Sequence, residues 1–300
     1  MNVLISGATG LIGTALGRHL SERGDNVWRL GRRPSAPGAQ EMQWDPAAGR
    51  IDLRALPGPD AVVHLAGENI GAGRWSAAKK ARIRYSRVRG TALLAEALVR
   101  LPRPPRVLVC ASASGYYGER GDATLDESSG AGAGFLADVA RAWEAAAEPA
   151  RQAGMRVVHC RTAPVLSARG GALAPMLWPY RLGLGGPLGS GRQWFSWVAL
   201  DDVVRAYAHV LDRVDLAAAV NVASPQPVRQ RDFARALGRV LRRPAIFPVP
   251  ALALRAFFGE VAREMLLVSQ RVVPVALRAH GFAFAYPDLE TALRHVLGRR

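Results

Sequence analysis

Three glycines near the start of the chain have the spacing of a phosphate-binding turn. Gly7, Gly10 and Gly13 form G-x-x-G-x-x-G between an apolar stretch of strand length at 2–6 and an amphipathic stretch at 14–23. Glycine turns tightly and brings backbone N–H groups close to a pyrophosphate, toward which the following helix also directs its positive end. This order of strand, turn and helix predicts a bound dinucleotide. The alternative is a turn that only packs strand against helix. The residues expected at the cofactor are Gly7, Thr9, Gly10, Leu11, Ile12 and Gly13.

The end of the second strand, expected at 26–30, indicates which dinucleotide binds. An acidic residue there would bond the ribose 2′-hydroxyl of NAD, whereas an arginine suits the 2′-phosphate of NADP. The chain has Arg32 and Arg33 at this point and no acid until Glu41. A guanidinium offers a charged fork to phosphate oxygens, so we expect NADP(H), with Arg32 the stronger candidate. The alternative is that both arginines are solvated surface residues.

Other residues should meet the cofactor from neighbouring strands, because the carboxyl ends of parallel strands line one crevice. Leu65, Ala66 and Gly67 leave the strand expected at 60–67 and are small enough to let a ligand approach. A helix is expected over 75–100, with Ser76 as the N-cap candidate. Arg87 on this helix is also expected to contact the cofactor. Glu68 and Asn69 at the crevice mouth are either functional or plain loop residues.

A hydroxyl-rich turn follows the strand expected at 106–111. Ser112 and Ser114 are placed to hold a substrate oxygen, and Tyr116 is the better candidate for a proton donor. Ser112 would also touch the cofactor. The alternative is that Tyr117 packs inside the turn and Tyr116 lines the pocket without chemistry.

The remaining pattern predicts an α/β fold, a Rossmann-like doubly wound parallel sheet with a smaller C-terminal substrate lobe. Residues 1–165 are expected to form the NADP-binding domain, with 193–224 completing the sheet, and 166–192 with 225–300 to form the lobe. We expect helices over 135–153, 203–213 (capped by Asp201 and Asp202), 228–242 and 251–273 (two packed helices), strand-like structure over 193–200, and a last helix capped by Asp288. Residues 183–191 read as a glycine-rich loop.

Composition limits the classes of function. The chain of 300 residues is 49% hydrophobic and 21% charged, which are globular values. Its net charge of +16 comes almost wholly from arginine, since Lys79 and Lys80 are the only lysines. No nucleic-acid motif accompanies that charge, so we expect no specific nucleic-acid partner. No apolar run approaches a membrane span, and no leader pattern precedes the first strand. We therefore expect a cytoplasmic protein with no membrane partner.

Two cysteines and two histidines lie in apolar strands. Cys110 and Cys160 are expected to be free, buried thiols in neighbouring strands, and neither has the spacing of a metal site. His64 and His159 are expected in the core. We expect no metal.

These stretches together resemble the extended short-chain dehydrogenase/reductases, and more narrowly an atypical NADP-binding "epimerase family". The matching runs are GATGLIG at 7–13, VVHLAG at 62–67, ASASGYYG at 111–118, RTAPV at 161–165, FSWVALDDVVRA at 195–206, VNVAS at 220–224 and a C-terminal module over 258–290. The resemblance covers essentially the whole chain. It implies NADP(H), a small-molecule substrate such as a sugar nucleotide or carbonyl compound, and a homodimer.

One feature of the family is missing. The wider family places Tyr-x-x-x-Lys on the helix after the fourth strand, where the lysine charge lowers the pKa of the tyrosine. The helix expected over 135–153 has neither residue. We therefore hold three hypotheses, in this order: an oxidoreductase or epimerase-like enzyme without the usual pair; a catalytically silent NADP(H) sensor; and a polyanion- or nucleic-acid-binding protein suggested by charge alone.

Overall fold

A large, mostly parallel sheet forms the centre of the molecule. The computed structural model describes residues 1–32, 39–71 and 73–299. The sheet has the order β13-β8-β6-β5-β1-β2-β3-β4, and its strands are parallel except for the antiparallel β4. The strands are β1 (Asn2–Ser6), β2 (Asn26–Gly31), β3 (Glu41–Asp45), β4 (Arg50–Ile51), β5 (Ala61–His64), β6 (Val107–Ala113), β8 (Arg156–Thr162) and β13 (Ala218–Val222). The order runs outward from β1 in both directions, which confirms the doubly wound fold.

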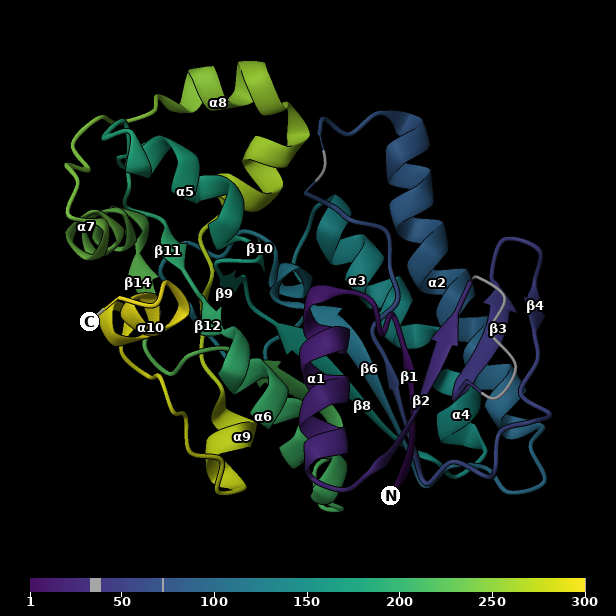
Figure 1. Cartoon of the computed structure of the whole chain (residues 1–300). Coiled ribbons are helices and arrows are strands. Elements are labelled where there is room, and N and C mark those ends of the chain that lie inside the picture. The colour runs from purple at the N-terminus through teal and green to yellow at the C-terminus, as the bar shows by residue number, and fades with distance from the viewer. Residues whose placement is uncertain (33–38, 72, 300) are drawn as a thin grey trace.

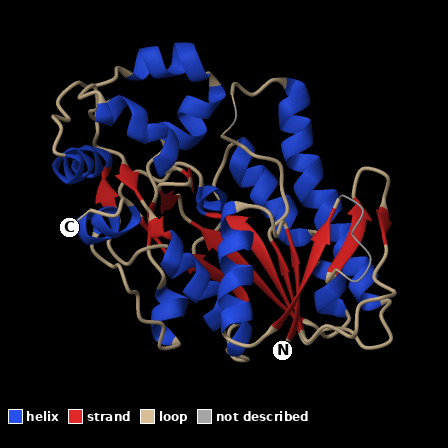
Figure 2. Cartoon of the chain, viewed as in Figure 1, coloured by secondary structure: helices blue, strands red, loops and turns tan. Residues whose placement is uncertain are grey.

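Helices cover both faces of this sheet, as Figure 2 shows. On one face α1 (Leu11–Glu22) and α6 (Leu200–Asp212) pack on Val3 and Ile5 of β1. On the other face α2 (Ala77–Val99) and α4 (Glu148–Gln152) pack on Leu4, and α3 (Phe135–Ala145) lies beside α2. Because successive side chains of a strand point to opposite faces, one short apolar strand supplies both cores.

Three small sheets and a further hydrophobic core lie beside the main sheet. β9 (Val165–Ser167) pairs with β10 (Gly170–Gly171) and β12 (Val198–Ala199), β11 (Trp194–Phe195) with β14 (Val228–Arg229), and β7 (Thr124–Leu125) with β15 (Arg271–Val272). The other helices of this part of the chain are α5 (Leu173–Arg181), α7 (Gln230–Leu241), α8 (Ala251–Phe258), α9 (Val275–Ala279) and α10 (Leu289–Val296). Figure 1 shows α5, α7 and α8 gathered beyond the carboxyl ends of the main strands.

Several boundaries differ from those expected. The helix expected over 135–153 is broken into α3 and α4, with Pro149 at the start of the second helix. Of the segment 193–224, β13 joins the main sheet, while β11 and β12 pair in the small sheets. The stretch 251–273 contains α8 and a short π-helix η2 (Ala262–Leu266), which are in contact, and then the strand β15. The expectation of two packed helices therefore holds only as far as Leu266, and the helical structure does not extend to 273. Residues 183–191 form a loop between α5 and β11, as expected, apart from an isolated bridge at Leu188. The division into two domains stays a prediction.

The caps show why some helix ends were predictable. Ser76 caps α2 by accepting from Lys79 N at 3.2 Å, and Asp288 caps α10 by accepting from Thr291 N at 2.9 Å. The cap expected at Asp201 and Asp202 is absent, because α6 starts at Leu200 and both acids lie in its first turn. Asp202 instead accepts from the backbone N–H groups of Ala285 and Tyr286, a tertiary contact that no local pattern reveals.

The expected core histidines are buried. His64 Nδ1 lies 2.6 Å from Ser6 Oγ, and its Nε2 lies 2.9 Å from Thr91 Oγ1, which also accepts from Trp143 Nε1. This chain of contacts ties β1, β5, α2 and α3 together below the crevice. His159 is buried in β8, and its Nδ1 has no hydrogen-bond partner within the described residues. Burial lowers the pKa of both His64 and His159 to about 4.

We predict that the free energy of unfolding falls as the pH drops from 6.5 toward 4. In that window the unfolded chain binds protons at both histidines and the folded chain does not, so acid favours unfolding. The effect should reach on the order of 3 kcal/mol for each imidazole. Urea unfolding at stepped pH measures it. His159→Leu should reduce the slope without costing a hydrogen bond, and an equal slope in that variant would contradict the assignment.

Candidate functional site

The glycine turn after β1 is held against the exit of β5. Gly7 has φ +68°, and a Cβ there would lie 2.8 Å from Leu65 C and Ala66 N. A Cβ on Gly13 would lie 2.3 Å from Gly7 O. Real Cβ atoms do not approach so closely, so both positions require glycine. The turn therefore brings β1, α1 and β5 together at the carboxyl edge of the sheet.

The start of α1 leaves its backbone donors free for a ligand. Its N-cap is Gly10, which has no side chain to accept from the first turn, and no acidic residue lies in that turn. Thr14 Oγ1 donates to Ala8 O at 3.1 Å, which fixes the turn from behind. Uncapped N–H groups and the helix dipole favour an anion here. Thr9 and Gly10 are exposed at the same end, and Leu11 and Ile12 are half-buried.

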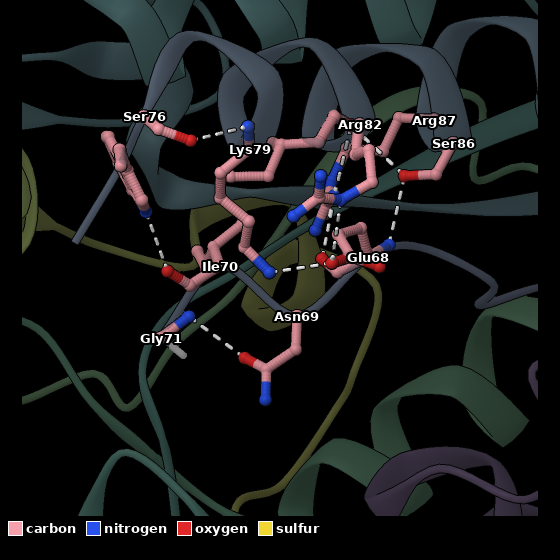
Figure 3. A network of polar contacts seen from close by, with 11 residues as sticks. Glu68, Asn69, Ile70, Gly71, Ser76, Lys79, Arg82, Ser86 and Arg87 are labelled. Atoms are coloured by element: carbon pink, nitrogen blue, oxygen red, sulfur yellow. Dashed lines mark hydrogen bonds and ion pairs between the residues drawn. The ribbon is translucent and has the colours of Figure 1, made fainter. Parts of the chain in front are cut away.

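The exit of β5 carries a dense ionic network (Figure 3). Lys79 Nζ donates to Glu68 Oε1 at 2.6 Å, and Arg82 Nε lies 3.8 Å from the same oxygen. The hydrogen bond from Lys79 lowers the pKa of Glu68. The Glu68 backbone N–H donates to Ser86 Oγ at 3.0 Å. Glu68 therefore anchors the loop after β5 to α2, a role that the sequence left open between function and plain loop.

Arg87 lies directly behind this loop. Its Nη1 donates to Glu68 O at 3.0 Å and to Ile83 O at 3.3 Å, and a Cβ on Gly67 would lie 3.2 Å from its Cζ. No carboxylate forms an ion pair with Arg87 in the part of the chain that the structure describes. Burial lowers its pKa to about 10. The Arg87 guanidinium also lies 5.0 Å from the centroid of the Trp143 ring. A cation that is held by backbone carbonyls and an aromatic ring next to the glycine turn is suited to an anionic ligand.

The arginines expected at the second strand are only partly placed. Arg32 follows β2, is exposed, and contributes to lowering the Glu68 pKa, so it faces the same network. Arg33 lies outside the described residues. The structure thus brings Arg32 toward the β5 exit and says nothing of Arg33.

The hydroxyl-rich turn after β6 lies over a second buried network. Ser112 Oγ donates to Glu144 Oε1 at 2.7 Å, and Arg161 binds the same carboxylate with Nε and Nη2 at 2.9 Å each. Arg161 Nη1 also donates to Tyr117 OH at 3.1 Å, and Tyr117 OH donates to Asn221 Oδ1 at 2.7 Å. The network joins β6, α3, β8 and β13 at the carboxyl edge of the sheet.

The two tyrosines of this turn differ in exposure. Tyr117 is fully buried, and burial raises its pKa to about 12. Tyr116 is half-buried, and the Arg161 guanidinium lies 3.5 Å from its ring centroid. Ser114 starts the turn η1 (Ser114–Tyr117) and is buried. Tyr117 therefore packs inside the turn, while Tyr116 is only partly buried.

Sequence reasoning missed Glu144 and Arg161. Glu144 follows Trp143 on an alanine-rich helix, and Arg161 is the next-to-last residue of β8. A charged residue directly after the buried run Val157–Cys160 was the signal that marked Arg161. The partner could not be inferred, because 17 residues and a second helix separate the two. Among the described residues no group of His, Cys, Asp and Glu could hold a metal ion.

We predict that Glu144→Gln costs about 3 kcal/mol of folding stability, because it leaves the Arg161 charge buried without a counter-charge. Arg161 and Glu144 side chains are 6% and 13% exposed. Urea unfolding measures the loss, and adding Arg161→Met should restore part of it. Glu148→Gln is the matched control: its pair with Arg151 is 44% exposed on both sides and should cost under about 1 kcal/mol. Equal costs for the two carboxylates would contradict the account.

Comparisons with known proteins agree with this geometry. The model of the NAD dependent epimerase/dehydratase family matches residues 3–223, and a domain of unknown function, DUF1731, matches residues 249–296. An epimerase family protein of Mycobacterium tuberculosis is 43% identical over 297 residues, which is 99% of this chain and 98% of that protein.

Two solved structures are also similar to this chain in fold. The human epimerase family protein SDR39U1, solved with NADPH, has a TM-score of 0.89 and 35% identity, with all of both chains covered. A nucleoside-diphosphate sugar epimerase from Corynebacterium glutamicum has a TM-score of 0.81 and 36% identity, covering 99% of this chain and 58% of that one. NADPH in the human structure matches the cofactor expected from Arg32. The chain therefore belongs to the NAD dependent epimerase/dehydratase family, is similar to proteins named epimerase family proteins, and carries a C-terminal match to DUF1731.

Proposed function

We propose that this protein binds NADP(H) in the turn between β1 and α1 and acts as an oxidoreductase or as a nucleotide-sugar epimerase-like enzyme. The observation that carries the proposal is the uncapped start of α1 beside two glycines that admit no Cβ. That arrangement fits a pyrophosphate between the carboxyl ends of β1 and β5. The human relative solved with NADPH and the Corynebacterium protein named as an epimerase support the cofactor and the reaction class.

The residues around the turn would each contact a different part of the cofactor. Leu65, Ala66 and Gly67 provide a surface without long side chains beside the turn. Arg87 supplies a buried positive charge behind that surface, and its Nη1 is already fixed by two carbonyls. Arg32 supplies an exposed guanidinium at the end of β2 for the 2′-phosphate.

The chemistry would take place over the turn after β6. When bound, the nicotinamide exchanges a hydride with a carbon that bears a hydroxyl or carbonyl group. Tyr116 has the half-buried phenol at this end and would transfer the proton at the substrate oxygen. Arg161 lies under its ring at 3.5 Å and is itself held by Glu144, so a fixed cation stands beside the phenol. The hydroxyls of Ser112 and Ser114 would position the substrate oxygen.

A second candidate function is a silent NADP(H) sensor. Helix α3 has neither tyrosine nor lysine, and the Ser112 hydroxyl already donates to the buried Glu144. A sensor would bind the cofactor tightly and exchange no hydride with any carbonyl compound. The two candidates share the cofactor site and differ only at Tyr116 and the serines.

We predict that Arg32→Asp removes a preference for NADPH over NADH, because it replaces the guanidinium beside the 2′-phosphate with a repelling carboxylate. Loss of one charge-assisted contact should weaken NADPH binding by about tenfold or more. Fluorescence titration with both cofactors measures it. Arg100→Asp is the control, since Arg100 caps the far end of α2. Binding of neither cofactor by the wild type would overturn the proposal.

We predict that Tyr116→Phe lowers turnover by about 10²- to 10⁴-fold, the range expected when a general acid is lost. Screening the wild type with NADPH against carbonyl compounds and sugar nucleotides supplies the substrate for this comparison. Tyr85→Phe, a change of the same kind on the outer surface of α2, should leave turnover unaltered. Undiminished turnover in Tyr116→Phe would remove the tyrosine from the mechanism, and cofactor binding without any turnover would favour the sensor.

A further inference from the structure

Helix α8 is apolar yet lies on the surface of the molecule. It spans Ala251–Phe258 with the sequence ALALRAFF, in which Arg255 is the one charged residue. Of its eight residues only Leu254 is buried, while Leu252 is 79% exposed and Phe257 74% exposed. A surface helix normally buries its apolar side, so α8 lacks a partner for most of that side in the described chain.

Other exposed apolar side chains lie around α8. Among the described residues, twelve large hydrophobic side chains are exposed, and eight of them fall within 178–184 and 246–258. We call these eight the α5–α8 face: Trp178, Leu182, Leu184, Ile246, Phe247, Leu252, Phe257 and Phe258. Single exposed hydrophobic side chains occur on the surface of any protein, but a cluster of them marks an interaction surface.

Backbone contacts hold the two segments of the α5–α8 face together. Phe247 N donates to Gly185 O at 3.2 Å, and Val249 N donates to Pro187 O at 2.9 Å. Arg243 Nε donates to Arg181 O at 3.2 Å at the end of α5. Figure 1 shows α5 and α8 next to each other at the outer end of the lobe. The eight side chains therefore belong to one region of the surface.

The same region is positively charged. The sequence has no aspartate or glutamate from 149 to 200 or from 233 to 259. Arg181 and Arg255 lie within the segments of the face, and Arg243 lies three residues before the second segment and donates to Arg181 O. None of the three arginines forms an ion pair with a described carboxylate. The face thus combines exposed aromatic and aliphatic side chains with unpaired guanidinium groups and carries no acid within its segments.

We propose that the α5–α8 face binds reversibly to the surface of an anionic lipid bilayer. Apolar and aromatic side chains insert at the boundary of headgroups and acyl chains, while arginines pair with anionic headgroups. A second copy of this chain fits less well, because a two-fold contact would bring together two copies of the same positively charged face, whose segments contain no acid. This surface contact differs from the expectation of no membrane partner, which came from the lack of a spanning run. No helix among the described residues is long and apolar enough to cross a membrane.

Vesicle co-sedimentation of the full-length protein with NADPH tests the proposal. One set of vesicles contains phosphatidylcholine with phosphatidylglycerol, and the other contains phosphatidylcholine alone. We expect binding to the anionic vesicles to be about tenfold tighter than to the neutral ones at physiological salt. Leu252→Asp and Phe257→Asp should each weaken binding to the anionic vesicles by about tenfold. Both side chains are exposed, so these variants should fold.

Val214→Asp is the matched control, because Val214 is 84% exposed and lies outside the face. It should bind anionic vesicles as the wild type does, and Arg243→Gln should reduce the preference for anionic lipid. The proposal is overturned by absence of binding to either vesicle, by equal binding to both, or by an equal loss in Val214→Asp. Light scattering that shows a dimer which Leu252→Asp converts to monomer would also overturn it, since a second copy would then cover the face.

Discussion

Close approach of backbone to backbone at the turn after β1 is the constraint on which the rest of the site depends. Gly7 lies against the backbone of the β5 exit, and Gly13 lies against Gly7 O, so neither position admits a side chain. This contact fixes where α1 starts and directs its uncapped N–H groups between β1 and β5. The main sheet and its two layers of helices hold that geometry rigid. The His64 chain of contacts does so directly, because it joins β1, β5 and α2 immediately below the turn.

The charges around the site are arranged in two layers of different purpose. Near the β5 exit, Glu68 forms ion pairs with Lys79 and Arg82 and so fixes the loop. Arg87 has no ion pair with a carboxylate among the described residues. Under the β6 turn, Glu144 neutralises Arg161 and lets that cation lie beneath Tyr116. The first layer is suited to holding a phosphate-bearing ligand. The second places a fixed cation next to a phenol on the turn after β6, and not on α3, the helix on which the Tyr-x-x-x-Lys pair of the wider family is expected.

Local features of the sequence predicted the fold well. The glycine spacing, the apolar strands and the caps at Ser76 and Asp288 depend on residues a few positions apart, and the structure confirms them. The break between α3 and α4 was missed because an alanine-rich stretch favours helix throughout and Pro149 is tolerated in a first turn. The roles of Glu144, Arg161 and Asp202 were missed because their partners come from distant parts of the chain. Whether two charged side chains are buried against each other depends on the tertiary structure, and the hydrophobic periodicity of the sequence does not show it.

Hydrogen–deuterium exchange of the full-length protein with and without NADPH tests the central claim most directly, because it locates the ligand without requiring a substrate. The account predicts that NADPH slows exchange at the amides of residues 7–13 and 65–69, where the turn and the β5 exit form the expected phosphate site. Exchange at α10, which packs on α7 and β9, should be unchanged. Protection confined to other segments, or no protection at saturating NADPH, would contradict the claim that this turn is the dinucleotide site.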